Sequence, residues 1–116
     1  MANTIYIVIP VFNRLEFTRD CLNSLRKQTY GEFKVIVVDD GSTDGTYQHL
    51  KDNYPEVIIL QGDGNLWWTG ATNMGVRKAL ELSASNEDYI LTLNNDLVVI
   101  PEYLQELMSV AKQEKP

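Results

Sequence analysis

The sequence has 116 residues, 44% of them hydrophobic, so it can bury one modest core, and we expect residues 1–116 to form a single domain. Ten lysine and arginine residues against sixteen acidic residues give a net charge of −6 without any basic run, which argues against a nucleic-acid partner. The longest apolar run is much shorter than the roughly 18 residues that span a bilayer, and no signal-like segment opens the sequence, so we expect a cytoplasmic location.

Four short segments rich in Val, Ile, Tyr and Phe alternate along the chain with four helical patterns. Most of these segments are nearly continuous apolar runs, which is typical of strands covered on both faces of a parallel sheet. The alternation predicts an α/β fold, a three-layer α/β/α sandwich with a mainly parallel sheet. The predicted strands are 5–9, 33–38, 57–60 and 89–93. The helical faces that follow them in chain order are Phe17, Cys21, Leu22 and Leu25; Tyr47 and Leu50; Ala71, Gly75, Ala79 and Leu82; and Leu104, Leu107, Met108 and Ala111.

The ends of these elements carry further signals. Thr43 or Asp44 is placed to cap the second predicted helix, and Pro101 suits the first turn of the last one. A four-stranded sheet has two edges, and no further segment of the sequence obviously covers them. We therefore expect the chain to be part of something larger, with exposed edges that favour self-association into a homo-oligomer.

Two residues with reactive side chains have plain structural interpretations. Cys21, the only cysteine, lies on an apolar helical stripe, so we expect a small buried side chain that takes part in no internal disulfide. His49, the only histidine, lies among polar residues of the short second helix, where we expect a solvated surface residue without a catalytic role.

Two polar turns directly follow predicted strands, at the sheet edge where open α/β folds bind ligands. The turn 39–44 reads Asp-Asp-Gly-Ser-Thr-Asp and offers acceptors for a nucleobase N–H or a ribose hydroxyl; the alternative is an ordinary turn rich in turn-forming residues. Asn94-Asn95-Asp96 could hold a hard cation through oxygen ligands and leave room for phosphate oxygens; the alternative is a polar turn with a helix-capping Asp. Together the two turns are expected to face one crevice.

A glycine-rich loop at 62–73 leads into a predicted helix, whose first N–H groups could approach an anion. It lacks both the Gly-x-Gly-x-x-Gly spacing of dinucleotide sites and the lysine of a phosphate-binding loop. The loop contains the adjacent pair Trp67 and Trp68, of which we expect at most one in the core, while the other could stack on a base or sugar.

These motifs together resemble family 2 glycosyltransferases of the GT-A fold, and the similarity runs over essentially the whole chain. The resemblance implies a Rossmann-like nucleotide-binding half of such an enzyme. The motifs that carry it are the segment 7–14 (Ile-Val-Ile-Pro-Val-Phe-Asn-Arg), Ser24-Leu25, Gln28-Thr29, the segment 37–44, Gly64-Asn65, Asn73 with Gly75, and the segment 93–96.

The resemblance implies a role for particular positions. Backbone around Pro10 would line the nucleotide pocket, Asp40 would accept a hydrogen bond from a pyrimidine base, and Asp96 would bind Mg²⁺ or Mn²⁺. Asn94 stands where the family usually has a first Asp, which removes one negative charge from the metal site. The full set of implied nucleotide-sugar contacts is Pro10, Val11, Phe12, Asn13, Asp40, Gly41, Asn65, Trp67, Asn73, Asn94 and Asn95.

The implied reaction is metal-assisted transfer of a sugar, with inversion, from a UDP- or dTDP-linked donor to an acceptor hydroxyl of a saccharide or glycolipid. The Asn-Asn-Asp form with the Leu66-Trp67-Trp68 loop is most similar to the rhamnosyltransferase-like branch, in polysaccharide or glycoconjugate assembly. The family is about twice this length, and its C-terminal half supplies the acceptor pocket and the catalytic base. We therefore identify no catalytic residue here and expect this donor-binding half to be weakly active or inactive alone.

Two alternatives belong to other functional classes. A nucleotide-sugar-binding or protein-interaction module without catalysis would show the same motifs. A phospho-receiver domain has a similar length and an acidic pair, but its pair should follow the first strand, whereas Asp39 and Asp40 follow the second.

Overall fold

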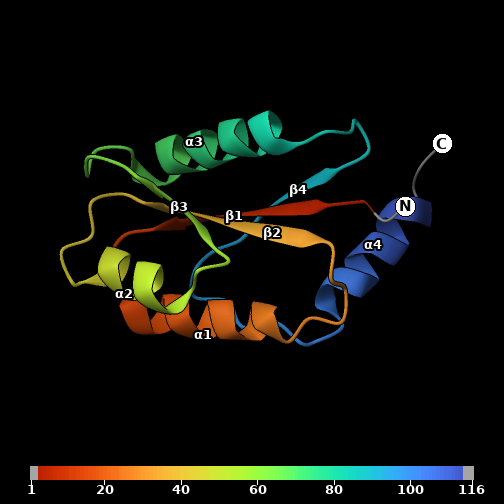
Figure 1. The fold of residues 1–116 in the computed structure, drawn as a ribbon, viewed down its shortest axis with the longest axis horizontal. Helices are drawn as coiled ribbons and strands as arrows, with labels where there is room; N and C mark the ends of the chain where they lie inside the picture. Colours follow the sequence, from red (N-terminus) through yellow and green to blue (C-terminus); the bar gives the residue numbers. More distant parts are fainter. Residues whose placement is uncertain (1–2, 114–116) are drawn as a thin grey trace.

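The structure is a computed structural model that describes residues 3–113. Four strands and four helices alternate strictly along this part of the chain, as the sequence predicts (Figure 1). The strands are β1 (Ile5–Val11), β2 (Phe33–Asp39), β3 (Ile58–Gln61) and β4 (Tyr89–Thr92). The helices are α1 (Leu15–Arg26), α2 (Thr46–Asn53), α3 (Trp67–Leu82) and α4 (Tyr103–Gln113).

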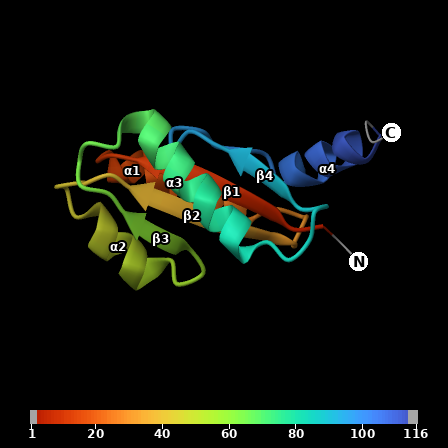
Figure 2. The ribbon, with the colours of Figure 1, turned by 90° about the horizontal axis from the view of Figure 1, so that it is seen from above.

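All strand pairs are parallel, and the strands lie in the order β3-β2-β1-β4. Side chains of α1, α2 and α4 join the larger core cluster on one face of the sheet, whereas α3 alone packs in the second cluster on the other face. Figures 1 and 2 show the resulting three layers, with α3 across the sheet from α1 and α2. The predicted three-layer α/β/α sandwich with a parallel sheet is thus confirmed.

The central strands explain why a parallel sheet forms. In β1, Ile5 to Ile9 and Val11 are buried, and in β2 the last five residues are buried. They are buried because helices cover both faces of the sheet. Continuous apolar runs have no solvent-facing side and therefore suit the middle of such a sandwich. In the register of the two strands, Val11 pairs with Asp39, so both strands end at the same level.

Helix α3 contacts the sheet through one glycine, Gly75. A Cβ on Gly75 would stand 2.3 Å from Cγ1 of Val8 and 3.2 Å from Cγ2 of Val38. No real side chain fits such a gap, so the absence of a Cβ at this position sets the spacing between helix and sheet.

Some element ends differ from the predicted ones. Strand β1 runs two residues further than predicted, to Val11, and α3 begins at Trp67 within the glycine-rich segment. Neither Thr43 nor Asp44 is the N-cap of α2: that position is Gly45 and has no side-chain cap, although the Asp44 carboxylate accepts the Thr46 N–H at 3.1 Å. Pro101 lies in a turn two residues ahead of α4 and not within its first turn.

Among residues 3–113, no helix combines the length and the apolar character that crossing a bilayer requires. Cys21 is fully buried in the larger core cluster, as predicted. His49 is only half-buried, and its ring lies 6.3 Å from the Tyr54 ring, so it is less solvated than the sequence pattern indicates.

Candidate functional site

The carboxyl ends of β1, β2 and β4 meet at one edge of the sheet. Strand β1 lies between the other two, so the chain leaves it toward β2 on one side and returns as β4 on the other. Such a reversal of strand order opens a crevice at the carboxyl edge, where open α/β sheets bind ligands. A pocket of about 270 Å³ occupies this edge and is lined by Pro10, Val11, Phe12, Asp40, Gly64, Trp67, Trp68 and Ala71.

The first acidic turn is held by its own carboxylates. Asp39 and Asp40 are 2% and 6% exposed, so both carboxylates need internal partners. Oδ1 of Asp39 accepts the N–H of Ser42 at 3.1 Å. Asp40 reaches across to the glycine-rich loop, where Oδ1 accepts the Gly64 N–H at 2.9 Å and Oδ2 accepts the Leu66 and Trp67 N–H groups at 3.0 and 2.9 Å.

The loops after β1 and β2 are also tied to each other. The Asn13 N–H donates to Oγ of Ser42 at 2.7 Å, and Oδ1 of Asn13 accepts the Thr43 N–H at 2.8 Å. Asn13 adopts a left-handed backbone conformation with φ of 56°. Gly41 has φ of 78°, and a Cβ on it would lie 2.9 Å from Cα of Gly64. The predicted residues Asn13 and Gly41 therefore shape the loops beside the pocket without lining it.

Asp44 completes this arrangement by joining the turn to α1. Its Oδ2 accepts the Leu15 N–H at 3.2 Å, and its Oδ1 accepts from both the N–H and the hydroxyl of Thr46. Burial alone would raise the pKa of Asp44, but the hydrogen bonds from Thr46 and Leu15 outweigh it and hold that pKa below its ordinary value. The loop therefore stabilises the charged form of this carboxylate.

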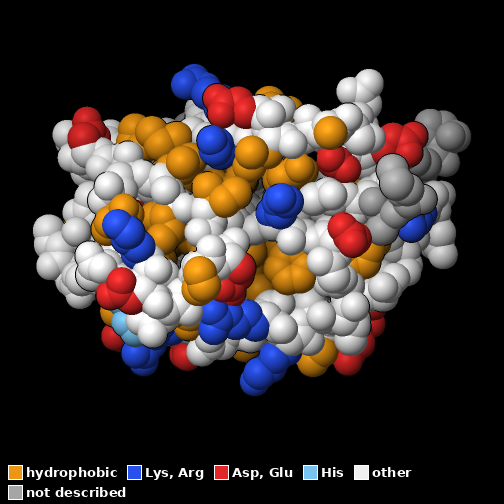
Figure 3. All heavy atoms as spheres, viewed as in Figure 1, with side chains coloured by type: hydrophobic (Ala, Val, Ile, Leu, Met, Phe, Trp, Pro, Cys, Tyr) orange, Lys and Arg blue, Asp and Glu red, His pale blue; other side chains and the backbone are white. Residues whose placement is uncertain are grey.

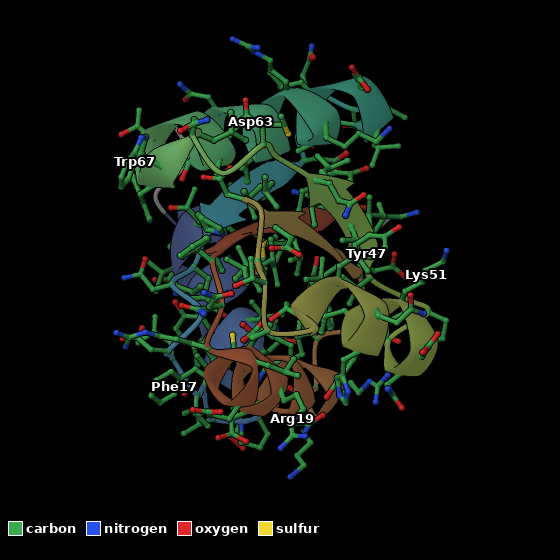
Figure 4. All side chains as sticks on the ribbon, turned by 90° about the vertical axis from the view of Figure 1, so that its left-hand side faces the viewer. Phe17, Arg19, Tyr47, Lys51, Asp63 and Trp67 are labelled. Carbon is green, nitrogen blue, oxygen red and sulfur yellow. The ribbon has the colours of Figure 1, made fainter. Side chains whose placement is uncertain are left out.

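The two tryptophans form an exposed aromatic wall of the pocket. Trp67 is 77% exposed and Trp68 is 56% exposed, so neither is a core residue. The sequence analysis allowed at most one of them in the core. They occupy the first turn of α3 and not an extended segment, so their side chains do not point to opposite faces as those of neighbouring strand residues do. Figure 4 shows Trp67 at the outer start of α3, directed away from the core. Phe12, 57% exposed, adds a third aromatic ring to the pocket.

The second turn connects the two helical layers. Nε1 of Trp68 on α3 donates to Oδ1 of Asn94 at 3.3 Å, and Nδ2 of Asn95 donates to Oγ1 of the buried Thr18 on α1 at 3.1 Å. The turn is thereby fixed from both sides of the sheet, and its last residue, Asp96, is exposed. Across residues 3–113, no group of three or more His, Cys, Asp or Glu side chains is arranged to hold a metal ion.

The remaining predicted contacts lie outside the pocket lining. Asn65 and Asn73 are exposed, and the N–H of Asn65 donates to Oδ1 of Asp63 at 2.9 Å. The structure thus brings five of the predicted residues into the pocket lining, namely Pro10, Val11, Phe12, Asp40 and Trp67. Gly64 and Ala71 line it as well; for Ala71 the available signal was its position one helical turn after Trp67 and Trp68.

Comparison with known proteins gives consistent results for sequence and fold. The chain is 30% identical to glycosyltransferase YibD of Escherichia coli (strain K12), covering 97% of this chain and 32% of that protein. It is also 30% identical to glycosyltransferase GlyG of Streptococcus pneumoniae serotype 4, covering 92% of this chain and 35% of that protein. The chain therefore spans about a third of the length of these relatives.

Solved structures show the same fold. A crystal structure of Staphylococcus aureus TarS, residues 1–349, superposes with a TM-score of 0.77 at 24% identity, covering 95% of this chain and 32% of that one. Mannosyltransferase PcManGT from Pyrobaculum calidifontis gives a TM-score of 0.75 at 20% identity, covering 97% and 32%. The family model described as glycosyl transferase family 2 matches residues 6–116. The chain therefore belongs to glycosyl transferase family 2.

Proposed function

We propose that this chain is the donor-binding part of a glycosyltransferase that moves a sugar from a UDP- or dTDP-linked donor to an acceptor hydroxyl with inversion. Membership of the family supports the class of reaction. TarS has been solved with UDP and with UDP-GlcNAc, and PcManGT with GDP-Man and Mn²⁺, which supports a nucleotide-sugar donor and a divalent metal. The polysaccharide or glycoconjugate role and the cytoplasmic location remain expectations of this proposal.

The observation that carries the proposal is the aromatic pocket beside the first polar turn, with Asp40 in its lining and Trp68 bonded to Asn94 of the second turn. Its aromatic wall suits a planar base, because rings stack favourably on Trp and Phe. The wall continues through Trp68 to Asn94, so a ligand whose base lies among the aromatic residues would extend its phosphates toward Asp96. This is the layout that a nucleoside diphosphate requires.

The residues present fit a divalent cation of the kind that nucleotides bring with them. Asp96 offers an exposed carboxylate, and Asn94 adds an amide oxygen in the same turn. Mg²⁺ in nucleotide sites is held by one or two carboxylates together with phosphate oxygens, so one protein carboxylate is sufficient. When bound, such an ion would stabilise the negative charge of the departing nucleoside diphosphate. An acidic chain of net charge −6 would otherwise repel that product.

The acceptor side of the reaction belongs to the proposal for the whole protein. No residue of this chain is assigned as the base that removes the acceptor proton, and the relatives are about three times as long. We propose that the 116 residues bind the donor and are weakly active or inactive by themselves. A binding module without catalysis would bind the same nucleotides but would never release nucleotide from a donor in the presence of an acceptor.

The test is calorimetric titration of UDP, dTDP and GDP into the chain, with and without Mn²⁺. We expect metal-dependent binding of UDP or dTDP, and Asp96→Asn should weaken binding at least tenfold with Mn²⁺ while changing little without it. Asp52→Asn on α2, which removes a carboxylate away from the pocket, serves as the matched control and should behave like the parent. If a folded parent binds none of the three nucleotides under either condition, the proposed function is wrong.

A further inference from the structure

The segment that carries Asp96 leaves β4 and runs beside α1 before it enters α4 (Figure 1). A backbone bond fixes its start, because the Leu93 N–H donates to the carbonyl oxygen of Val8 at 2.9 Å. A second bond fixes it further along, where the Val99 N–H donates to Oγ of Ser24 on α1 at 3.2 Å. Both ends of the segment are therefore held, and only one of the five residues between them is not exposed.

That residue is Asn95, and its side chain supplies a third point of attachment. Nδ2 of Asn95 donates to Oγ1 of Thr18 at 3.1 Å. Thr18 is fully buried on α1. A buried hydroxyl is costly unless it is hydrogen-bonded, and a valine of nearly the same shape would avoid that cost. The bond to Asn95 gives this hydroxyl a partner and joins the turn to the buried face of α1.

The attachment of Asn95 acts directly on the backbone of Asp96. The two are the central residues of a tight turn, which the Leu97 N–H closes by donating to the carbonyl oxygen of Asn94 at 3.2 Å. The side chain of Asn95 reaches the core, whereas the bond of Asn94 to Trp68 joins two exposed side chains, where water competes for it. Holding Asn95 therefore fixes the backbone from which the Asp96 carboxylate projects.

A cation site at this turn would depend on the direction of that carboxylate. The proposed function uses Asp96 as the one protein carboxylate on the ion, so no second carboxylate compensates for a displacement. Metal ligands keep their geometry through the groups that support them, and loss of such a group commonly costs about 10–100-fold in metal affinity. Thr18 has the position of a supporting group, since it holds the residue next to Asp96.

We propose that Thr18 is a positioning residue: its buried hydroxyl holds Asn95 and so sets the direction in which the Asp96 carboxylate meets a divalent cation that binds with the nucleotide. The inference rests on the proposed function for the presence of that cation. The attachment of the turn to α1 is measurable without any ligand, so the two proposals can fail separately.

The first experiment compares two variants of the same residue. Thr18→Val keeps the shape of the side chain and removes the hydroxyl, whereas Thr18→Ser keeps the hydroxyl and removes a methyl group. UDP is titrated into each variant by calorimetry, with and without Mn²⁺. We expect Thr18→Val to weaken binding about fivefold or more with Mn²⁺, and less than about twofold without it, because only the ion depends on the carboxylate. Thr18→Ser should stay within about twofold of the parent under both conditions.

A role in packing alone predicts a different order of the two variants. Loss of the methyl group in Thr18→Ser would then do as much harm as loss of the hydroxyl, and the effect of either would not depend on Mn²⁺. Either result would overturn the positioning role, and so would a Thr18→Val protein that binds UDP with Mn²⁺ as tightly as the parent does.

The second measurement is ligand-free and uses ¹⁵N relaxation of the backbone amides. We expect order parameters of about 0.85, typical of rigid backbone, at Asn95 and Asp96 in the parent and in Thr18→Ser. In Thr18→Val they should fall toward about 0.6, while Gly41 in the other polar turn keeps its parental value. Unchanged order parameters at Asn95 and Asp96 in Thr18→Val would show that the turn is held without Thr18 and would overturn the proposal.

A third measurement needs only the parent protein, in case Thr18→Val does not fold. The side-chain amide protons of Asn95 should exchange with water about tenfold more slowly than those of the exposed Asn94, after correction for intrinsic rates. Equal exchange would contradict the bond to Thr18 in solution. If the parent does not bind UDP, dTDP or GDP with or without Mn²⁺, the proposed function fails, while the two ligand-free measurements still decide how the turn is held.

Discussion

At the scale of single residues, burial decides what the reactive groups of this chain can do. Cys21 is fully buried, and desolvation, together with the nearby charge of Asp96, raises the pKa of its thiol to about 11. The thiolate is the reactive form of cysteine, so the folded state suppresses the chemistry of this side chain. The role of Cys21, close to Asp96, is to pack in the larger core cluster.

This predicts slow modification of Cys21 by a thiol reagent such as DTNB. At pH 8.5 the shifted pKa alone should lower the thiolate fraction about a hundredfold relative to an unfolded chain, and burial should slow the reaction further. The rate should rise steeply in urea as the protein unfolds. Equal rates in native buffer and in urea would show that Cys21 is accessible in the folded protein.

At the scale of elements, the site depends on how closely α3 approaches the sheet. The helix begins with the aromatic wall and, two turns later, presses Gly75 against Val8 and Val38. Helix position and pocket shape are therefore coupled, because a helix moves as a rigid unit. The tie between Trp68 and Asn94 extends this coupling to the turn that carries Asp96.

We predict that Gly75→Ala destabilises the protein by about 1–3 kcal/mol, the usual result of forcing an added methyl group into a packed core. Its Cβ would otherwise stand 2.3 Å from Cγ1 of Val8, so helix or strand must shift. Gly31→Ala is the matched control: nothing lies within 4 Å of a Cβ at that position, and it should change stability by less than about 1 kcal/mol. Chemical denaturation of both variants gives the comparison, and equal midpoints would contradict the packing argument.

At the scale of the whole molecule, the sheet has two edge strands, β3 and β4. Strand β4 presents Ile90, which is 39% exposed, and the surface shown in Figure 3 intersperses acidic and basic side chains without one large patch of either sign. Unpaired strand edges invite pairing with another chain. The chain spans a third of its relatives, and further segments or copies could cover these edges in the whole protein.

We expect the 116-residue chain to self-associate at high concentration, seen as a scattering mass that rises above 13.2 kDa. Ile90→Lys should reduce this association, since a charge on an edge strand opposes pairing. Val110→Lys on α4, an exposed apolar position outside the sheet, controls for added charge and should leave the association unchanged. A parent that stays monomeric at millimolar concentration would contradict the prediction.

Local patterns predicted most of the fold and part of the site. The apolar runs located all four strands within two residues at each end, because burial on both faces leaves a continuous signal. The tryptophan pair was harder to interpret, since the sequence pattern does not show that the helix already begins at Trp67 and leaves both rings exposed. Ala71 is small and apolar, so its type gives no sign of a binding site. It lines the pocket only because the fold places it beside the two tryptophans.

The parallel α/β sandwich and the meeting of two polar turns at one edge follow from the amino-acid pattern alone, because short-range periodicity locates each strand and parallel strands end on the same side. The partner of each polar side chain, by contrast, depends on the three-dimensional arrangement. Asp40 binds N–H groups 24 to 27 positions later, and Asn95 binds Thr18, 77 positions earlier. Such pairs follow from the strand order and from angstrom-scale distances between loops, and no local pattern encodes either of them.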